Sequence, residues 1–178
     1  MTTAHTKTTA GRGAASGALL AQEPAVGWRA GAAVSDGAKA LMGGRRALAH
    51  WPKSRAEIHV ALVRGLPCSA LLSLVDQLAD LPIDDLAAML GLSSRTLRRH
   101  RDHPDKLLPP DLASKTWQLA EVLAQAVLVM GDAASAQRWL LQPAQGLDGA
   151  RPVDLLRTLQ GTELVTEFLG RLEHGVYN

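Results

Sequence analysis

Cysteine is almost absent from the 178-residue sequence, where Cys68 is the single example. One cysteine excludes a disulfide within the chain and suits a reducing compartment, so we expect a cytoplasmic protein. Cys68 itself is most simply explained as a small residue of the core.

Long apolar runs are missing as well. The most apolar stretch, about Leu119 to Met130, is too short to cross a bilayer and contains Glu121 and Gln125. Residues 1–17 contain threonine, glycine and alanine but lack the apolar segment of a secretory signal. We therefore expect a soluble protein that makes no contact with a membrane.

Aromatic residues make up 3% of the chain, and no stretch alternates between apolar and polar residues as a half-buried strand does. Alanine and leucine, which both favour helices, dominate instead. The sequence therefore predicts an all-α protein, with enough apolar material for one ordinary domain or two small ones.

Catalytic patterns are also lacking. The sequence contains no Ser/His/Asp or Cys/His arrangement and no paired catalytic carboxylates, and Gly11-x-Gly13 does not follow a strand as a phosphate loop would. His100 and His103 have a spacing that could chelate a metal, but no further ligand pattern supports a site. We expect neither enzymatic activity nor a bound metal or cofactor.

Charge is unevenly distributed although the formal net charge is +2. Residues 1–110 contain 14 Lys and Arg against 9 Asp and Glu, whereas residues 111–178 contain 5 against 8. The basic front suits a polyanion, and the mildly acidic back suits a different partner.

The stretch from Ile83 to His100 has the pattern of a helix-turn-helix. Ala87 is small enough for a second helix to cross closely, Gly91 can end the first helix in a tight turn, and Ser93 or Ser94 can cap the second. Buried positions are predicted at Ile83, Leu86, Leu90, Leu92 and Leu97.

The second helix would present a polar and basic face to solvent. Such a face suits the major groove of double-stranded DNA, and the predicted contact residues are Ser94, Arg95, Thr96, Arg98 and Arg99. The alternative is a helical hairpin within a bundle, whose arginines are merely solvated. His100 occupies a position where an apolar residue is expected, and its ring could pack half-buried.

Three units are predicted along the chain. Residues 1–54, rich in Ala, Gly, Ser and Thr, form an unordered basic leader in which only Trp28 and Trp51 could dock; a flexible arm that touches phosphates is the alternative. Residues 55–110 form the helix-turn-helix unit, with a helix over 69–81 and either a helix or a strand over 58–64. Residues 111–178 form a small helical bundle.

The bundle is predicted to begin with a long helix over 112–130, which Gly131 ends. Asp132 caps the next helix, Pro143 to Gly149 form a loop, and Pro152 starts another short helix. The last helix, over 163–174, is expected to bury Leu164, Val165, Phe168, Leu169 and Leu172.

The C-terminal third resembles the toxin-binding domain of Xre/ParS-type antitoxins, the partners of RES-domain toxins in type II toxin–antitoxin systems. The residues that carry the likeness are Gly131-Asp132, Ala136, Trp139-Leu140, Pro143, Leu147, Gly149, Pro152, Leu155-Leu156, Thr158, Gly161, Val165, Leu169 and Glu173 to Tyr177. Upstream, Gly65-Leu66-Pro67 and Leu90 to Arg99 resemble the Xre-like half. Ala144 and Gly146 depart from the family, which often has Asn and Ala there.

The resemblance implies a protein with two binding ends. The helix-turn-helix would form a homodimer that represses its own operator, and the C-terminal domain would block a toxin that consumes NAD. Residues implied in toxin binding are Trp139, Gly175, Val176, Tyr177 and Asn178. Tyr177 could stack in an aromatic slot of the toxin while the chain's carboxylate meets a base.

Two other interpretations remain open from the sequence. The C-terminal residues could be a frayed end with an incidental tyrosine. The whole chain could be a stand-alone helix-turn-helix regulator whose C-terminal bundle binds a ligand or only dimerises.

Overall fold

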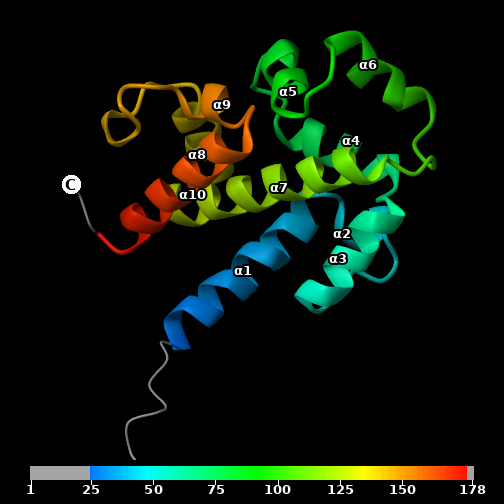
Figure 1. Ribbon diagram of the computed structural model, residues 1–178, viewed down its shortest axis with the longest axis horizontal. Coiled ribbons are helices and arrows are strands. Elements are labelled where there is room, and N and C mark those ends of the chain that lie inside the picture. The colour runs from blue at the N-terminus through cyan, green and yellow to red at the C-terminus, as the bar shows by residue number, and fades with distance from the viewer. Residues whose placement is uncertain (1–24, 176–178) are drawn as a thin grey trace, which may run out of the picture.

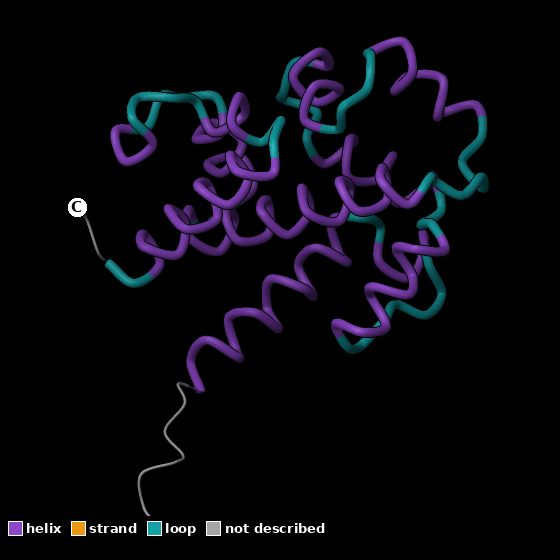
Figure 2. Tube along the Cα trace, viewed as in Figure 1, coloured by secondary structure: helices purple, strands orange, loops and turns teal. Residues whose placement is uncertain are grey.

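The computed structural model describes the backbone of residues 25–175 and the side chains of residues 31–175. All regular secondary structure in this part of the chain is helical (Figures 1 and 2), which confirms the predicted all-α class. The helices are α1 (Ala25–Leu41), α2 (Gly44–Ala47), α3 (Arg55–Arg64), α4 (Cys68–Gln77), α5 (Ile83–Met89), α6 (Ser94–Arg99), η1 (His100–Asp102), α7 (Pro110–Met130), α8 (Ala133–Leu140), η2 (Gln145–Leu147), α9 (Pro152–Leu155) and α10 (Leu159–Glu173).

Helix α7 is the central helix, around which the other helices are arranged (Figure 1). Pro110 starts it, where a missing N–H costs nothing, and Gly131 ends it with a left-handed φ of 91°. Helices α1, α3, α4, α8 and α10 all pack against α7. Within the described residues no single helix is both long and apolar enough to span a membrane; α7 and α8 meet both requirements only when taken together, and they are bent by 112° at their junction.

The predicted unordered leader is wrong for the part of residues 1–54 that the structure describes. Helix α1 runs along α7, and Ala38 and Met42 are fully buried. Gly37 allows this approach, because a Cβ there would lie 2.9 Å from Cβ of Ala124. Each small side chain of α1 buries little apolar surface, but together these side chains bury enough for α1 to pack against α7. Residues 1–24 lie outside the described residues.

Tryptophan fixes the end of this N-terminal segment. The indole N–H of Trp51 donates to the carbonyl of Gly44 at 2.7 Å, and its ring lies 6.2 Å from that of Trp117 on α7. The expectation that Trp51 could dock locally is confirmed. Trp28 lies in α1, but its side chain is outside the described residues.

The segment whose structure the sequence left open, residues 58–64, is a helix and belongs to α3. Ser54 caps α3 by accepting from the N–H of Glu57. Ile58 and Leu62 face the core, whereas Val60 and Val63 are exposed. The helix predicted over 69–81 begins one residue earlier, at Cys68, and ends four residues earlier, at Gln77.

One hydrophobic core joins the two halves of the described chain. The predicted boundary near residue 110 coincides with the start of α7, which packs against helices on both sides of it. Polar contacts also cross between the halves: the Gln137 amide donates to the carbonyl of Gln77 at 3.1 Å, and Arg157 pairs with Asp85 at 3.1 Å.

The prediction for the last helix needs two corrections. The helix begins at Leu159, four residues before the predicted start, because Thr158 caps it by accepting from the N–H of Gly161. The second correction concerns burial. Val165 and Leu169 are fully buried and Phe168 and Leu172 are half-buried, but Leu164 is 52% exposed. The buried residues of α10 are Gly161, Val165 and Leu169, which are four positions apart and share one face of the helix. Leu164 lies off this face and is therefore exposed to solvent.

Candidate functional site

The turn between α5 and α6 has the geometry that a helix-turn-helix requires. Gly91 has a φ of +68°, the N–H of Gly91 donates to Ala88 at 3.0 Å, and the N–H of Leu92 donates to Ala87 at 2.8 Å. This pair of hydrogen bonds is a Schellman motif, which satisfies the last carbonyls of α5 and turns the chain sharply. Gly91 therefore acts as predicted.

Ser93, and not Ser94, caps α6. Its hydroxyl accepts from the N–H of Thr96 at 3.1 Å and lies 2.9 Å from the Thr96 hydroxyl. Leu97 is 2% exposed and points into the core, as predicted. Cap and core contact together fix which face of this six-residue helix meets solvent.

The outer face of α6 is cationic. Arg95, Arg98 and Arg99 are exposed, and among the described residues no carboxylate lies within 4.0 Å of them. Ser94 and Thr96 are half-buried beside them. By contrast, the next arginine, Arg101, pairs with Asp76 of α4 at 2.8 Å. The predicted DNA-contact residues thus share one helix, and its three arginines are free to meet an outside anion.

His100 follows α6 directly and is half-buried, as predicted. Burial lowers the pKa of its imidazole, and the nearby charges of Arg99 and Lys106 lower that pKa further. Its carbonyl accepts from Sγ of Cys68 at 3.4 Å. Cys68 is fully buried, which confirms its role as a core residue, and burial raises the pKa of its thiol. In the described residues, no group of three or more His, Cys, Asp or Glu could hold a metal ion.

A second candidate surface lies at the other end of α7, around α8 and α10 (Figure 1). The Trp139 ring stacks on Phe168 with centroids 6.3 Å apart, and the Arg171 guanidinium lies 5.6 Å over the same phenyl ring. Gly146 faces that ring so closely that a Cβ would overlap Cε2 of Phe168. Glycine at position 146 therefore leaves the space that the Phe168 ring occupies.

The outer side of α10 leads toward the C-terminal residues. Leu164, Glu167, Arg171 and His174 follow one another along it, and the last three line an open hollow of ≈ 480 Å³ together with Gly170. Gly175 comes after α10, is exposed and has a φ of +69°. Val176, Tyr177 and Asn178, which the sequence also assigned to toxin binding, lie outside the described residues.

Comparison with known proteins matches the two parts of the chain to two domains of the same kind of antitoxin. The profile of the "Antitoxin Xre-like helix-turn-helix domain" matches residues 57–121, and that of the "Antitoxin Xre/MbcA/ParS C-terminal toxin-binding domain" matches residues 123–175. The Antitoxin Xre of Yersinia enterocolitica is 30% identical over 131 residues, which are 71% of this chain and 86% of that protein. The chain belongs to the Xre antitoxin family.

Other relatives agree with this assignment, and the resemblance stated from the sequence is confirmed. The Antitoxin Xre of Pseudomonas putida is 31% identical over 67% of this chain and 72% of its own length, and that of Photorhabdus laumondii is 26% identical over 69% and 82%. A chain of the crystal structure of the M. tuberculosis MbcT–MbcA toxin–antitoxin complex superposes with a TM-score of 0.47 at 20% identity, covering 62% of this chain and 96% of that one.

The sequence missed the contacts that join the two surfaces. Asp85, in the first turn of α5, pairs with Arg157, 72 positions away in the chain. Gln137 is 7% exposed and bridges α8 to the end of α4 through Gln77 and Asp80. No local pattern marks such pairs, because both partners are ordinary surface residue types that only the packing brings together.

Proposed function

We propose that this protein is the antitoxin of a type II pair: it neutralises a RES-domain, NAD-consuming toxin without any catalysis of its own and represses transcription from its own operator. The observation that carries the proposal is the placement of the two family modules. The cationic helix α6 lies near the start of α7, and the end of α10 lies near the end of α7 (Figure 1). The protein can therefore bind DNA at α6 and a toxin at the end of α10, at separate places.

The DNA-binding half of the proposal depends on α6. Arginine side chains without a carboxylate partner can bond guanine edges or phosphates in the major groove. We propose contacts from Ser94, Arg95, Thr96, Arg98 and Arg99, made by a homodimer whose two recognition helices meet successive turns of the duplex. The Schellman turn at Gly91 and the cap at Ser93 support this role, because they hold the helix rigidly outward.

Arg95→Ala and Arg98→Ala test this half directly. Each should weaken operator binding, and a residue that contacts only phosphate should lower the salt slope of the binding constant by about one unit. Arg138→Ala, which removes an exposed arginine from α8, is the matched control and should leave operator binding unchanged. Operator affinity that ignores both α6 changes would show that the recognition helix has been misassigned.

The toxin-binding half depends on the C-terminal end. We propose that Trp139 supports the surface from within, by stacking on Phe168, and that Gly175 to Asn178 enter the toxin's active site. Tyr177 would stack in the slot that accepts the dinucleotide, and occupation of that slot excludes substrate by simple competition. The exposed face of α10 that precedes Gly175 supports the proposal, because it offers contact area next to the inserted residues.

Removal of Val176 to Asn178 tests whether these residues enter the toxin's active site. The shortened protein should keep its fold and its operator affinity while its inhibition of NAD consumption by the toxin falls strongly. Tyr177→Phe keeps the ring and should inhibit nearly as well as the original chain, whereas Tyr177→Ala should not. Full inhibition by the shortened protein would refute insertion of these residues.

The choice of toxin is tested by the neighbouring gene. Co-expression of the chain with that gene's product should yield a stable complex when the product is a RES-domain protein. Recovery of the chain alone, with no such gene beside it, would favour the stand-alone helix-turn-helix regulator instead.

A further inference from the structure

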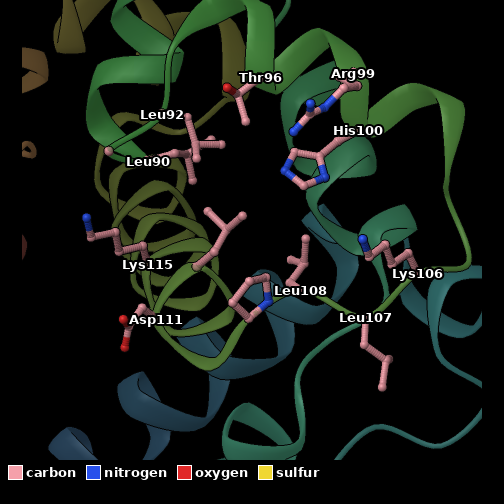
Figure 3. A pocket seen from close by; sticks show the side chains of 13 residues that line it. Leu90, Leu92, Thr96, Arg99, His100, Lys106, Leu107, Leu108, Asp111 and Lys115 are labelled. Atoms are coloured by element: carbon pink, nitrogen blue, oxygen red, sulfur yellow. The ribbon is translucent and has the colours of Figure 1, made fainter.

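A cavity of ≈ 430 Å³ opens between the helix-turn-helix and the start of α7. Figure 3 shows it from close by: the turn of Leu90 to Leu92 forms one wall, Thr96, Arg99 and His100 form another, and α7 with the loop before it closes the third side. Its volume falls within the range of small-molecule sites, roughly 300–1,000 Å³. Neither family module assigns a ligand to this place.

The base of the cavity is apolar. Leu90, Leu108 and Leu112 line it and belong to the buried core, with exposed fractions of 2%, 2% and 7%. These side chains come from the α5–α6 turn, the loop before α7 and α7 itself. The apolar base is therefore held by three parts of the fold that pack on one another, and a ligand would find it already formed.

The rim of the cavity is cationic. Arg99, Lys106 and Lys115 line it from three different segments, with Arg99 and Lys106 on one side and Lys115 on the other in Figure 3. Asp111 is the single carboxylate among the lining residues, and no ion pair within 4.0 Å joins it to any of these cations in the described chain. Positive charge thus remains in excess above an apolar base.

The imidazole of His100 is exposed to the positive charge of the same rim. It lines the cavity between Arg99 and Lys106 in Figure 3, and after burial those two charges are the causes that lower its pKa. Lys115 and Asp111 are the charged groups that α7 adds to the same cavity. A bound anion would offset the excess positive charge felt by His100, and a neutral molecule would not.

We propose that this cavity is a binding site for a small organic anion with an apolar body. The apolar base favours a hydrocarbon or aromatic group, and the three cations favour a carboxylate, sulfonate or phosphate at the opening. An inorganic anion would leave the base unfilled, and a neutral compound would leave the cations unpaired. Because Thr96 and Arg99 line the cavity and also belong to the proposed DNA face, the bound anion would weaken operator binding; this last consequence rests on the proposed function.

Anilinonaphthalene sulfonate is a suitable probe, and the neutral N-phenylnaphthylamine is its matched control without the charge. Titrated into the full chain and followed by fluorescence, the sulfonate should bind and the neutral compound should bind at least about tenfold more weakly. The double variant Lys106→Gln/Lys115→Gln should lose about tenfold in affinity for the sulfonate and little for the neutral compound. Lys53→Gln, which removes an exposed lysine outside the cavity, should change neither. Equal binding of the two compounds, or indifference to the double variant, would overturn the proposal.

Amide resonances locate the probe. Those of Gly91, Leu92 and His100 should shift on addition of the sulfonate, while those of α10 stay in place. Shifts gathered instead around exposed leucines such as Leu128 and Leu164 would place the probe elsewhere and overturn the site. Loss of operator affinity in the double variant with unchanged sulfonate binding would also overturn it, since the lysines would then be DNA contacts. If the original chain bound the probe but no operator, the proposed DNA-binding function would fail and the cavity site would stand.

Discussion

At the scale of single residues, the turn between α5 and α6 depends on Gly91. We predict that Gly91→Ala lowers the free energy of unfolding by about 1 kcal/mol, because an alanine at a φ of +68° is strained. The space itself is a minor obstacle: the nearest atom is the flexible end of Lys115, which can move away. Urea denaturation measures the change.

Gly31→Ala is the matched control for that measurement. Gly31 lies within helix α1, and no atom lies within 4 Å of the place that an alanine methyl group would take, so alanine should raise stability by about 0.5–1 kcal/mol. Two glycines of the same chain should thus respond with opposite signs. A loss of stability at Gly31, or none at Gly91, would contradict the assigned backbone conformations.

Gly146 and Phe168 form a pair in which the size of one limits the other. We predict that Gly146→Ala destabilises the protein by about 1–3 kcal/mol, because its Cβ would overlap the Phe168 ring. Phe168→Leu should cost stability alone but should reduce the penalty of Gly146→Ala in the double variant. A double-mutant cycle by urea denaturation measures this coupling, and additive changes would show that the ring does not occupy that space.

The conformation and burial of a single residue can be predicted from the sequence where neighbouring residues determine them. The turn at Gly91, the buried Leu97 and the half-buried His100 are all predictable, since a turn, a helix period and a polar interruption are visible in neighbouring positions. The prediction that Leu164 is buried is wrong, because several of its neighbours on α10 are also apolar and the period alone does not say where the buried stripe ends. The Gly146–Phe168 contact spans 22 positions and has no local signal.

At the scale of elements, the N-terminal helix is the main departure from the sequence prediction. Composition rich in alanine and glycine predicts an unordered leader, but these residues let α1 pack closely along α7. A low apolar content predicts disorder only for a segment that has no apolar neighbour to pack on. The helices of the helix-turn-helix module and the C-terminal bundle are predicted more closely because caps, glycines and prolines mark their ends.

Met42 tests whether this N-terminal segment is part of the fold. The side chain is fully buried, so Met42→Ala should lower the free energy of unfolding by about 2–5 kcal/mol, through lost burial and the cavity left behind. Met42→Leu, which keeps the volume, should cost less than about 1.5 kcal/mol. Thermal or urea denaturation of both variants measures the difference. A neutral Met42→Ala would mean that this segment does not pack into the core in solution.

At the scale of the whole molecule, the helix-turn-helix module and the C-terminal module are joined by more than the shared α7. Asp85 on α5 pairs with Arg157, which follows α9, and the two side chains are 17% and 42% exposed. We predict a coupling energy of about 0.5–1 kcal/mol in a double-mutant cycle of Asp85→Asn and Arg157→Gln. Arg101, which pairs with Asp76 and not with Asp85, supplies the control cycle of Asp85→Asn with Arg101→Gln. Equal coupling in both cycles would show that the contact is not specific.

The two proposed interfaces are separated by the length of α7, whose 21 residues span about 30 Å. Operator DNA on α6 and a toxin on the end of α10 therefore should not exclude one another. The charge distribution and the family motifs predict two ends with different partners, but they cannot place them, since the direction of α7 relative to both modules is a property of the packed structure.

The most direct test of this account is native mass spectrometry of the chain mixed with its operator duplex and the product of the neighbouring toxin gene. We predict one assembly that contains all three components, and we expect Arg95→Ala to lose the duplex alone and removal of Val176 to Asn178 to lose the toxin alone. Displacement of the duplex by the toxin, or loss of both partners from either variant, would contradict two separate interfaces at opposite ends of α7.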